Sequence, residues 1–236
     1  MIKVILFDLD GTLLPMDQDK FVNEYLSTLA KKASKYGYDS NRLISTIWKG
    51  TKNMVTNNGT QTNETVFWNT FKEEYGQDAL LDKYIFDEYY VNEFQTLKKV
   101  CGFDAMSRCV IDILKSKGYR LVLATNPLFP SVSTESRMHW AGLDKEDFEL
   151  YTTYEASHYC KPNLNYYQEI LKNINCKPEE CLMVGNDIDE DMVVTKLGMK
   201  VFLLTDCLIN KNNVDITQYK NGNFKDLISY IDELVK

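Results

Sequence analysis

The sequence predicts an α/β protein, with a parallel sheet covered by helices on both faces and an all-helical segment inserted after the first strand. From about residue 100 onward, short apolar runs alternate with stretches of helical spacing, which is typical of parallel strands joined by crossover helices. Between about residues 15 and 97, only helical spacing recurs. We therefore expect a Rossmann-like core formed by residues 1–14 and 98–236 and a helical domain formed by residues 15–97.

The first strand is predicted at Val4 to Phe7, a short apolar run that suits a strand buried on both faces. It is followed at once by Asp8, Asp10 and Thr12. Ligands of open α/β sheets bind beyond the carboxyl ends of the strands, so two carboxylates here are placed for chemistry. An ordinary acidic turn would explain the same residues.

Four helices are predicted in the inserted segment, each by apolar residues at helical spacing. They are marked by Phe21, Tyr25, Leu29 and Ala33; by Leu43, Ile47 and Thr51; by Phe67, Phe71 and Tyr75, ending at Gly76; and by Leu81, Tyr84, Ile85 and Tyr89.

In the core, strands and helices are expected to alternate. The predicted strands are 120–125, 148–152, 181–184 and 201–204, and the predicted helices are 106–117, 130–141, 165–172, 193–197 and Phe224 to Val235. The first strand belongs to the same sheet, which makes the helical segment an insertion.

Composition excludes several classes of protein. A net charge of −7, without a basic cluster, argues against a nucleic-acid surface. No apolar run approaches the roughly 20 residues that cross a bilayer, and Asp8 and Asp10 interrupt the N-terminal run too early for a signal peptide. The six cysteines lack metal-type spacing and are expected to be reduced thiols in a cytoplasmic protein.

Four strand ends carry groups with distinct chemistry. Asp8 can act as a nucleophile towards a phosphoryl group, and Asp10 as general acid and base. Thr125 and Asn126 can hold phosphate oxygens through a hydroxyl and backbone N–H groups. Taken singly, each of these pairs is better explained as polar residues at the end of a strand.

The other two strand ends carry charge. Lys161, just before a helix, can neutralise phosphate, although most lysines are surface residues. The acidic stretch from Gly185 to Asp191 supplies the oxygen ligands that Mg²⁺ prefers, but acids also gather at helix N-termini for electrostatic reasons.

The order and placement of the four groups resemble the haloacid dehalogenase (HAD) superfamily. The matching motifs are Asp8-Leu-Asp-Gly-Thr12, Thr125-Asn126, Lys161 and Gly185-Asn-Asp-Ile-Asp-Glu-Asp191, which span nearly the whole core. The helical insertion is similar to the family's cap domain, and the resemblance is to the phosphatase branch.

The resemblance implies roles for individual residues. Asp8 would form an aspartyl-phosphate and Asp10 would be the general acid/base; Thr125, Asn126 and Lys161 would hold the phosphate. Mg²⁺ would bind Asp8, the Asp10 carbonyl and Asp187. Many members carry an acid directly after the glycine, where this chain has Asn186, so the metal role moves to Asp187, with Asp191 supporting it and Asp189 and Glu190 as possible substitutes.

The implied activity is Mg²⁺-dependent hydrolysis of a small phosphorylated metabolite. A halide leaves without a proton, so Asp10 favours phosphate chemistry over dehalogenation. A phosphomutase would use the same motifs and stays open. A phospho-accepting signalling module would be about half as long and would lack the insertion, and a non-catalytic binding member is the third alternative.

Overall fold

The computed structural model describes residues 1–234, and its centre is one six-stranded parallel sheet with the order β3-β2-β1-β4-β5-β6. The strands are β1 (Val4–Phe7), β2 (Arg120–Leu123), β3 (Leu150–Tyr151), β4 (Cys181–Gly185), β5 (Lys200–Leu204) and β6 (Asn221–Gly222). The α-helices are α1 (Gln18–Ser34), α2 (Ser40–Val55), α3 (Asn63–Tyr75), α4 (Lys83–Val91), α5 (Ala105–Ser116), α6 (Ser131–Trp140), α7 (Leu164–Asn173) and α8 (Phe224–Leu234). Short 3₁₀ helices cover Gln77–Asp82, Glu93–Val100, Lys145–Asp147, Pro178–Glu180, Met192–Leu197 and Ile216–Gln218. The predicted fold class is confirmed.

Both faces of the sheet are buried, because alternate residues of strands β1 to β5 pack in different apolar clusters. In β1, Ile5 and Phe7 join the cluster that also contains buried residues of α5 and α8. Val4 and Leu6 join the cluster that contains buried residues of α7. This two-sided burial explains why the central strands are continuous apolar runs in the sequence.

The strand order fixes where a ligand can bind. From β1 the chain builds β2 and β3 towards one edge of the sheet, and it then builds β4, β5 and β6 towards the other edge. β1 and β4 are neighbours, with Leu6 paired to Met183, so the connections that follow them diverge. A crevice forms at such a point, beyond the carboxyl ends of the two strands.

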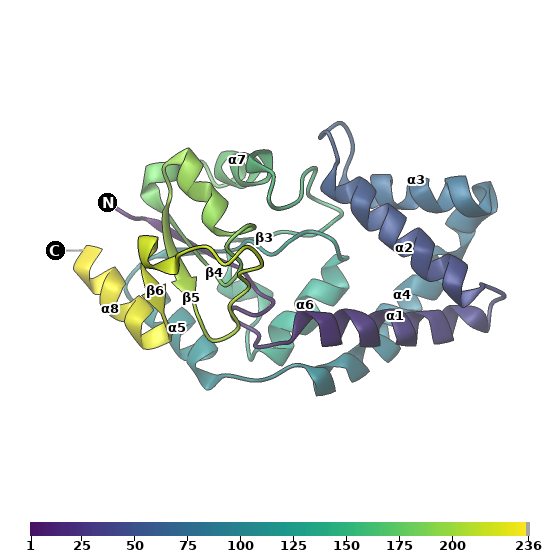
Figure 1. Ribbon diagram of the computed structural model, residues 1–236, viewed down its shortest axis with the longest axis horizontal. Helices are drawn as coiled ribbons and strands as arrows, with labels where there is room; N and C mark the ends of the chain where they lie inside the picture. The colour runs from purple at the N-terminus through teal and green to yellow at the C-terminus, as the bar shows by residue number, and fades with distance from the viewer. Residues whose placement is uncertain (235–236) are drawn as a thin grey trace.

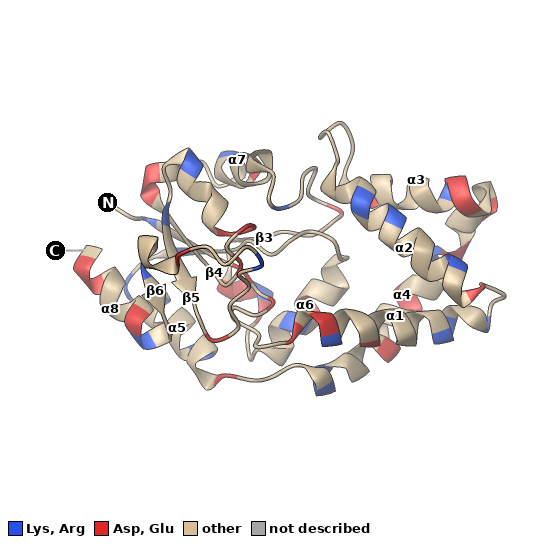
Figure 2. Cartoon of the chain, in the orientation of Figure 1, with Lys and Arg blue, Asp and Glu red and all other residues tan. Residues whose placement is uncertain are grey.

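Helices α1 to α4 lie together beside the sheet (Figure 1). The chain enters this group and leaves it by two adjacent passes: Met16 bridges Cys101, and the Gly102 N–H donates to the Pro15 carbonyl at 2.6 Å. A Cβ on Gly102 would lie 3.0 Å from Pro15 Cβ, so the close crossing favours glycine. Figure 2 shows acidic and basic residues interspersed along the helices.

Several elements differ in detail from the sequence expectation. The helix expected at 193–197 is a 3₁₀ helix, Leu81 lies in a 3₁₀ helix rather than in α4, and the strand expected at 148–152 is only Leu150–Tyr151. β6 was not expected, because Asn221 and Gly222 carry no apolar pattern. Val235, the expected end of the last helix, lies outside the described residues. No helix within residues 1–234 is long and apolar enough to cross a membrane.

Candidate active site

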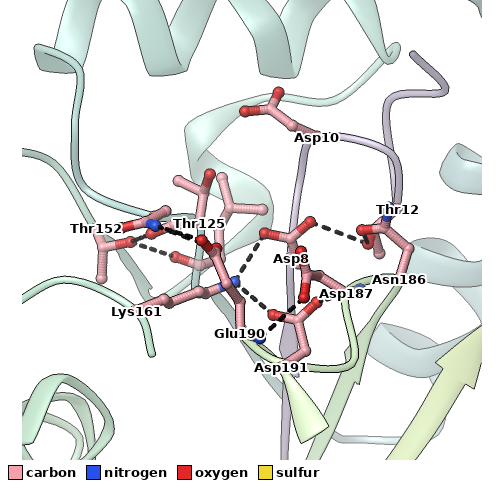
Figure 3. A network of polar contacts seen from close by, with 12 residues as sticks. Asp8, Asp10, Thr12, Thr125, Thr152, Lys161, Asn186, Asp187, Glu190 and Asp191 are labelled. Atoms are coloured by element: carbon pink, nitrogen blue, oxygen red, sulfur yellow. Dashed lines mark hydrogen bonds and ion pairs between the residues drawn. The ribbon is translucent and has the colours of Figure 1, made fainter. Parts of the chain in front are cut away.

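The four predicted groups meet at the carboxyl edge of the sheet (Figure 3). Asp8 follows β1 directly, Thr125 and Asn126 follow β2, Lys161 lies on the loop between β3 and α7, and residues 186–191 follow β4. Parallel strands end at one edge of a sheet, so groups that are far apart in the sequence become neighbours there.

Lys161 is the centre of the arrangement. Its Nζ lies 2.8 Å from Asp8 Oδ1 and 2.7 Å from Asp191 Oδ1, and its side chain is fully buried. Burial opposes the positive charge, but Asp191 and Asp8 together raise the pKa of Lys161 well above its usual value. Burial raises the pKa of Asp191, and the attraction of Lys161 opposes that shift. The ammonium therefore stays charged between two carboxylates.

The second oxygen of Asp8 is also held. Thr12 Oγ1 lies 3.0 Å from Asp8 Oδ2 and 3.0 Å from Asn186 Oδ1, so its single hydroxyl proton can be donated to either oxygen. The Asn186 amide donates to the Cys207 carbonyl at 2.6 Å. These bonds fix the Asp8 carboxylate in one orientation with both oxygens engaged.

Asp10 has different surroundings, and Figure 3 shows its carboxylate set apart from that of Asp8. Arg137 Nη1 donates to Asp10 Oδ2, while the buried Oδ1 has no hydrogen-bond partner among the described residues. Burial raises the pKa of Asp10, and Arg137 opposes this shift. Two carboxylates only two positions apart therefore have distinct environments, as an acid and a nucleophile require.

Arg137 was not identified from the sequence. It lies on α6 and is only 1% exposed, with its guanidinium 4.7 Å from the centre of the Phe129 ring. The available signal was its position on the helix, four residues after the buried Ser133 and four before the buried Ala141. A basic residue on the inward face of a helix needs a buried partner.

The groups expected to hold phosphate are partly arranged by their neighbours. The Thr125 carbonyl accepts hydrogen bonds from the hydroxyls of Thr152, at 2.6 Å, and Tyr166, at 2.8 Å. Asn126 Nδ2 donates to the Glu190 carboxylate at 3.1 Å. Burial raises the pKa of Glu190 to about 6. The loop after β2 is thus tied both to the loop after β3 and to the acidic stretch.

The four acids of the stretch after β4 point to different partners. Asp187 Oδ1 accepts from the backbone N–H groups of Asp189 and Glu190, at 2.8 and 3.0 Å. Asp189 is exposed and accepts from Asn212 at 3.1 Å, away from Lys161. Asp191 also accepts from the Asp187 N–H at 3.1 Å. The stretch is therefore an ordered turn, in which Asp191 shares the Lys161 ammonium with Asp8 (Figure 3).

The oxygen atoms at this edge of the sheet are of the chemical type that binds magnesium. Within residues 1–234, no three His, Cys, Asp or Glu side chains form a ready metal cluster. Mg²⁺ does not need one, since it is usually bound by one or two carboxylates with water and phosphate oxygens. The Asp8 and Asp187 carboxylates are such donors. From the residues that the structure describes, the Asp10 carbonyl accepts only a long hydrogen bond, 3.4 Å, from Gln18, and it remains available as a third oxygen.

Known proteins match along most of the chain. The profile of the haloacid dehalogenase-like hydrolases matches residues 2–193. A glyceraldehyde 3-phosphate phosphatase of Methanothermobacter thermautotrophicus is 26% identical, over 92% of this chain and 95% of that protein. A HAD phosphatase structure from Thermococcus onnurineus has a TM-score of 0.60 at 16% identity and covers 98% of both chains.

A second solved structure has the same fold. The Bacillus subtilis HAD-hydrolase YfnB, described as bound to magnesium, has a TM-score of 0.56 at 18% identity and covers 98% of both chains. The structural likenesses support the fold, and the profile supports the family. The chain belongs to the haloacid dehalogenase-like hydrolase family and is a hydrolase.

Proposed function

We propose that this protein is a phosphatase that hydrolyses a small phosphate monoester through an aspartyl-phosphate on Asp8. One observation carries the proposal: Asp8 is fixed by Lys161 and Thr12, whereas Asp10, two positions later, is paired separately and keeps one oxygen free. The relative from Methanothermobacter, named as a phosphatase, supports the same class of reaction.

The reaction takes two steps. An Asp8 oxygen forms a bond to phosphorus while the bond to the ester oxygen breaks, and Asp10 gives its proton to that leaving oxygen. Water then attacks the phosphorus, Asp10 takes up a proton from the water, and the bond to Asp8 breaks to release inorganic phosphate. Lys161 and Thr125, with the Asn126 backbone, bind the phosphoryl oxygens during both steps.

We further propose that Mg²⁺ is held by the Asp8 carboxylate, the Asp10 carbonyl and Asp187, with Asp191 in a supporting position. When bound, it would offset the repulsion between the anionic nucleophile and the anionic substrate. The long Gln18 contact at the Asp10 carbonyl and the oxygen chemistry of the donors support this assignment.

The domain division is part of the proposal. Residues 15–97 would act as a cap that selects the substrate and excludes water, over a core of residues 1–14 and 98–236. The two adjacent passes at Pro15–Met16 and Cys101–Gly102 support a narrow connection between them. All six cysteines are free thiols, which supports a cytoplasmic location.

The test is phosphate release from a panel of phosphorylated metabolites, with and without Mg²⁺, for wild type, Asp8→Asn and Asp189→Asn. We expect Mg²⁺-dependent release that Asp8→Asn abolishes and Asp189→Asn preserves, since the Asp189 carboxylate is bonded to Asn212. Isomerised sugar phosphate without free phosphate would instead identify a phosphomutase. Neither product from any substrate would indicate a non-catalytic member.

A further inference from the structure

Cys176 and Cys181 are in contact at the end of the sheet opposite the candidate active site. The Cys181 thiol donates to Cys176 Sγ, and the two sulfur atoms lie 3.6 Å apart. Cys181 is the first residue of β4, whereas the acidic stretch follows Gly185 at the other end of that strand. At about 3.3 Å per residue, roughly 13 Å of strand separates the two ends. The pair therefore lies outside the site proposed around Asp8.

The backbone on both sides of the pair is anchored. Cys176 follows α7, and its N–H donates to the Leu171 carbonyl at 3.0 Å. Cys181 is paired with Val4 in the sheet, and the 3₁₀ helix Pro178–Glu180 joins the two cysteines. A disulfide bond is about 2.05 Å long, so the sulfur atoms need to approach by only about 1.5 Å. The fold therefore holds the two thiols close to bonding distance.

The two thiols differ in their access to solvent. Cys176 is partly exposed and lines a surface pocket together with Lys172 and Pro178. Cys181 is completely buried, and its thiol also lies 3.4 Å from the Lys177 carbonyl, to which it can donate. Burial raises the pKa of the Cys181 thiol. A dissolved oxidant therefore meets Cys176 first, and Cys181 is placed to react with the product.

We propose that Cys176 and Cys181 are a site of reversible oxidation, at which hydrogen peroxide converts the two thiols into a disulfide. First, the Cys176 sulfur takes one hydroxyl of the peroxide, the O–O bond breaks, and the other hydroxyl leaves with the thiol proton as water. Next, the Cys181 sulfur bonds to the Cys176 sulfur, the S–O bond breaks, and the hydroxyl leaves with the Cys181 proton as a second water. Glutathione would reverse the oxidation by thiol–disulfide exchange.

The first experiment treats the whole protein with graded hydrogen peroxide, labels the remaining thiols with iodoacetamide in urea and digests the product with trypsin. Trypsin does not cleave between Lys177 and Pro178, so the peptide 173–196 contains both cysteines and no other. We expect this peptide to be unlabelled and lighter by two hydrogen atoms than its reduced form, and dithiothreitol to restore both labels. At the dose that oxidises the exposed Cys109, a peptide with Cys181 still labelled would overturn the inference.

Variants identify the role of each sulfur. Cys181→Ser keeps a donor for the Lys177 carbonyl but removes the second sulfur, and Cys181→Ala serves if the serine variant fails to fold. We expect a sulfenic acid on Cys176 to persist in this variant, where dimedone traps it, and not to accumulate in wild type. Cys109→Ser is the control and should form the disulfide as wild type does. Equal amounts of the dimedone adduct in wild type and Cys181→Ser would overturn the role of Cys181.

The disulfide should stabilise the fold, because it closes the loop 176–181 in the unfolded chain as well. We expect the thermal midpoint of oxidised wild type to rise by about 4–8 °C, and that of oxidised Cys181→Ser not to rise. Phosphate release should be equal in the two redox forms, since the pair lies at the far end of β4. A midpoint lowered by the disulfide would overturn the stabilising role. The peptide measurement needs no turnover, so it is independent of the proposed phosphatase function.

Discussion

Arg137 pairs with Asp10 although 127 positions separate the two residues in the chain. The guanidinium is buried, stacks on Phe129 and donates from Nε to the Ser133 carbonyl at 3.3 Å, so its position is fixed by α6. It engages one oxygen of Asp10, and within residues 1–234 the buried Oδ1 has no hydrogen-bond partner. The pair thus orients the carboxyl group while one oxygen remains free for proton transfer.

Replacing Arg137 should therefore affect turnover more than binding. We expect Arg137→Met to lower kcat by about a hundredfold with little change in KM, because the proton donor loses its orientation. Arg137→Lys should recover part of the loss, since it retains the charge without the planar fork. Arg42→Met is the matched control, because Arg42 stacks on Tyr75 at 4.6 Å within the helical region. Equal losses in the two Met variants, with circular dichroism unchanged, would contradict a positioning role.

Lys161 should be required for stability as well as for phosphate binding. Lys161→Met leaves the buried carboxylates of Asp8 and Asp191 without their shared cation, and we expect a loss of about 3–5 kcal/mol in the free energy of unfolding. Adding Asp191→Asn to that variant should restore part of the loss, because only one buried charge then remains. Urea unfolding in magnesium-free buffer measures both effects.

Lys117→Met provides the control for Lys161. Lys117 pairs with Asp232 at the surface, at 2.6 Å, and such pairs contribute about 0–1 kcal/mol. A Lys161 variant no less stable than this control would show that the buried triad does not support the fold.

Asp147 lies outside the active site, and its charge should make the free energy of unfolding depend on pH. Partial burial would raise the pKa of Asp147, but hydrogen bonds from Arg108 and Lys115 lower it to about 2. Because this value lies below the unfolded pKa of about 3.9, the stabilisation is fully present above that pH and is lost as the pH falls from about 4 towards 2. We expect Asp147→Asn to cost about 1 kcal/mol near neutral pH, after allowance for solvent screening, and progressively less below pH of about 4.

Urea unfolding of wild type and Asp147→Asn across this pH range measures the difference. Asp232→Asn, which removes the partner of Lys117 at the surface, is the comparison. A cost for Asp147→Asn that did not shrink with acidification would rule out a charge effect.

Magnesium should stabilise the folded protein through Asp187. At a hundredfold excess over its dissociation constant, a ligand of the folded state adds about 2.7 kcal/mol, and removing the metal with a chelator should reverse this. We expect Asp187→Asn to raise the magnesium concentration needed for this stabilisation at least about tenfold. Asp189→Asn should leave that concentration unchanged. Thermal unfolding over a magnesium series gives the affinities. Tighter binding in Asn186→Asp, with no effect of Asp187→Asn, would move the metal role to position 186.

Much of the site could be predicted because its groups directly follow apolar strands. Asp8 and the acidic stretch come directly after β1 and β4. Residues that directly follow a parallel strand lie at the carboxyl edge of the sheet, so predicting the strand also predicts their position. The partners of those groups depend on packing between distant elements. Nothing local distinguishes Asp189, bonded to Asn212, from Asp191, bonded to Lys161.

The same limit applies to the helical region. Residues such as Tyr25 and Phe67 lie at helical spacing, and the structure buries them. The periodicity shows only that one face of each helix is covered. Whether the covered faces meet fully or leave a cavity is decided by side-chain volumes in three dimensions.

The adjacency of Pro15 and Gly102 affects how such a chain can change in evolution. Seen from the sheet, residues 16–101 are one long excursion whose two ends lie side by side. The entropy of closing a loop grows only slowly with its length, so lengthening, shortening or exchanging this excursion changes little for the strands. The inserted helices can therefore be exchanged for other helices as one unit, while Asp8, Lys161 and Asp191 keep their positions at the edge of the sheet.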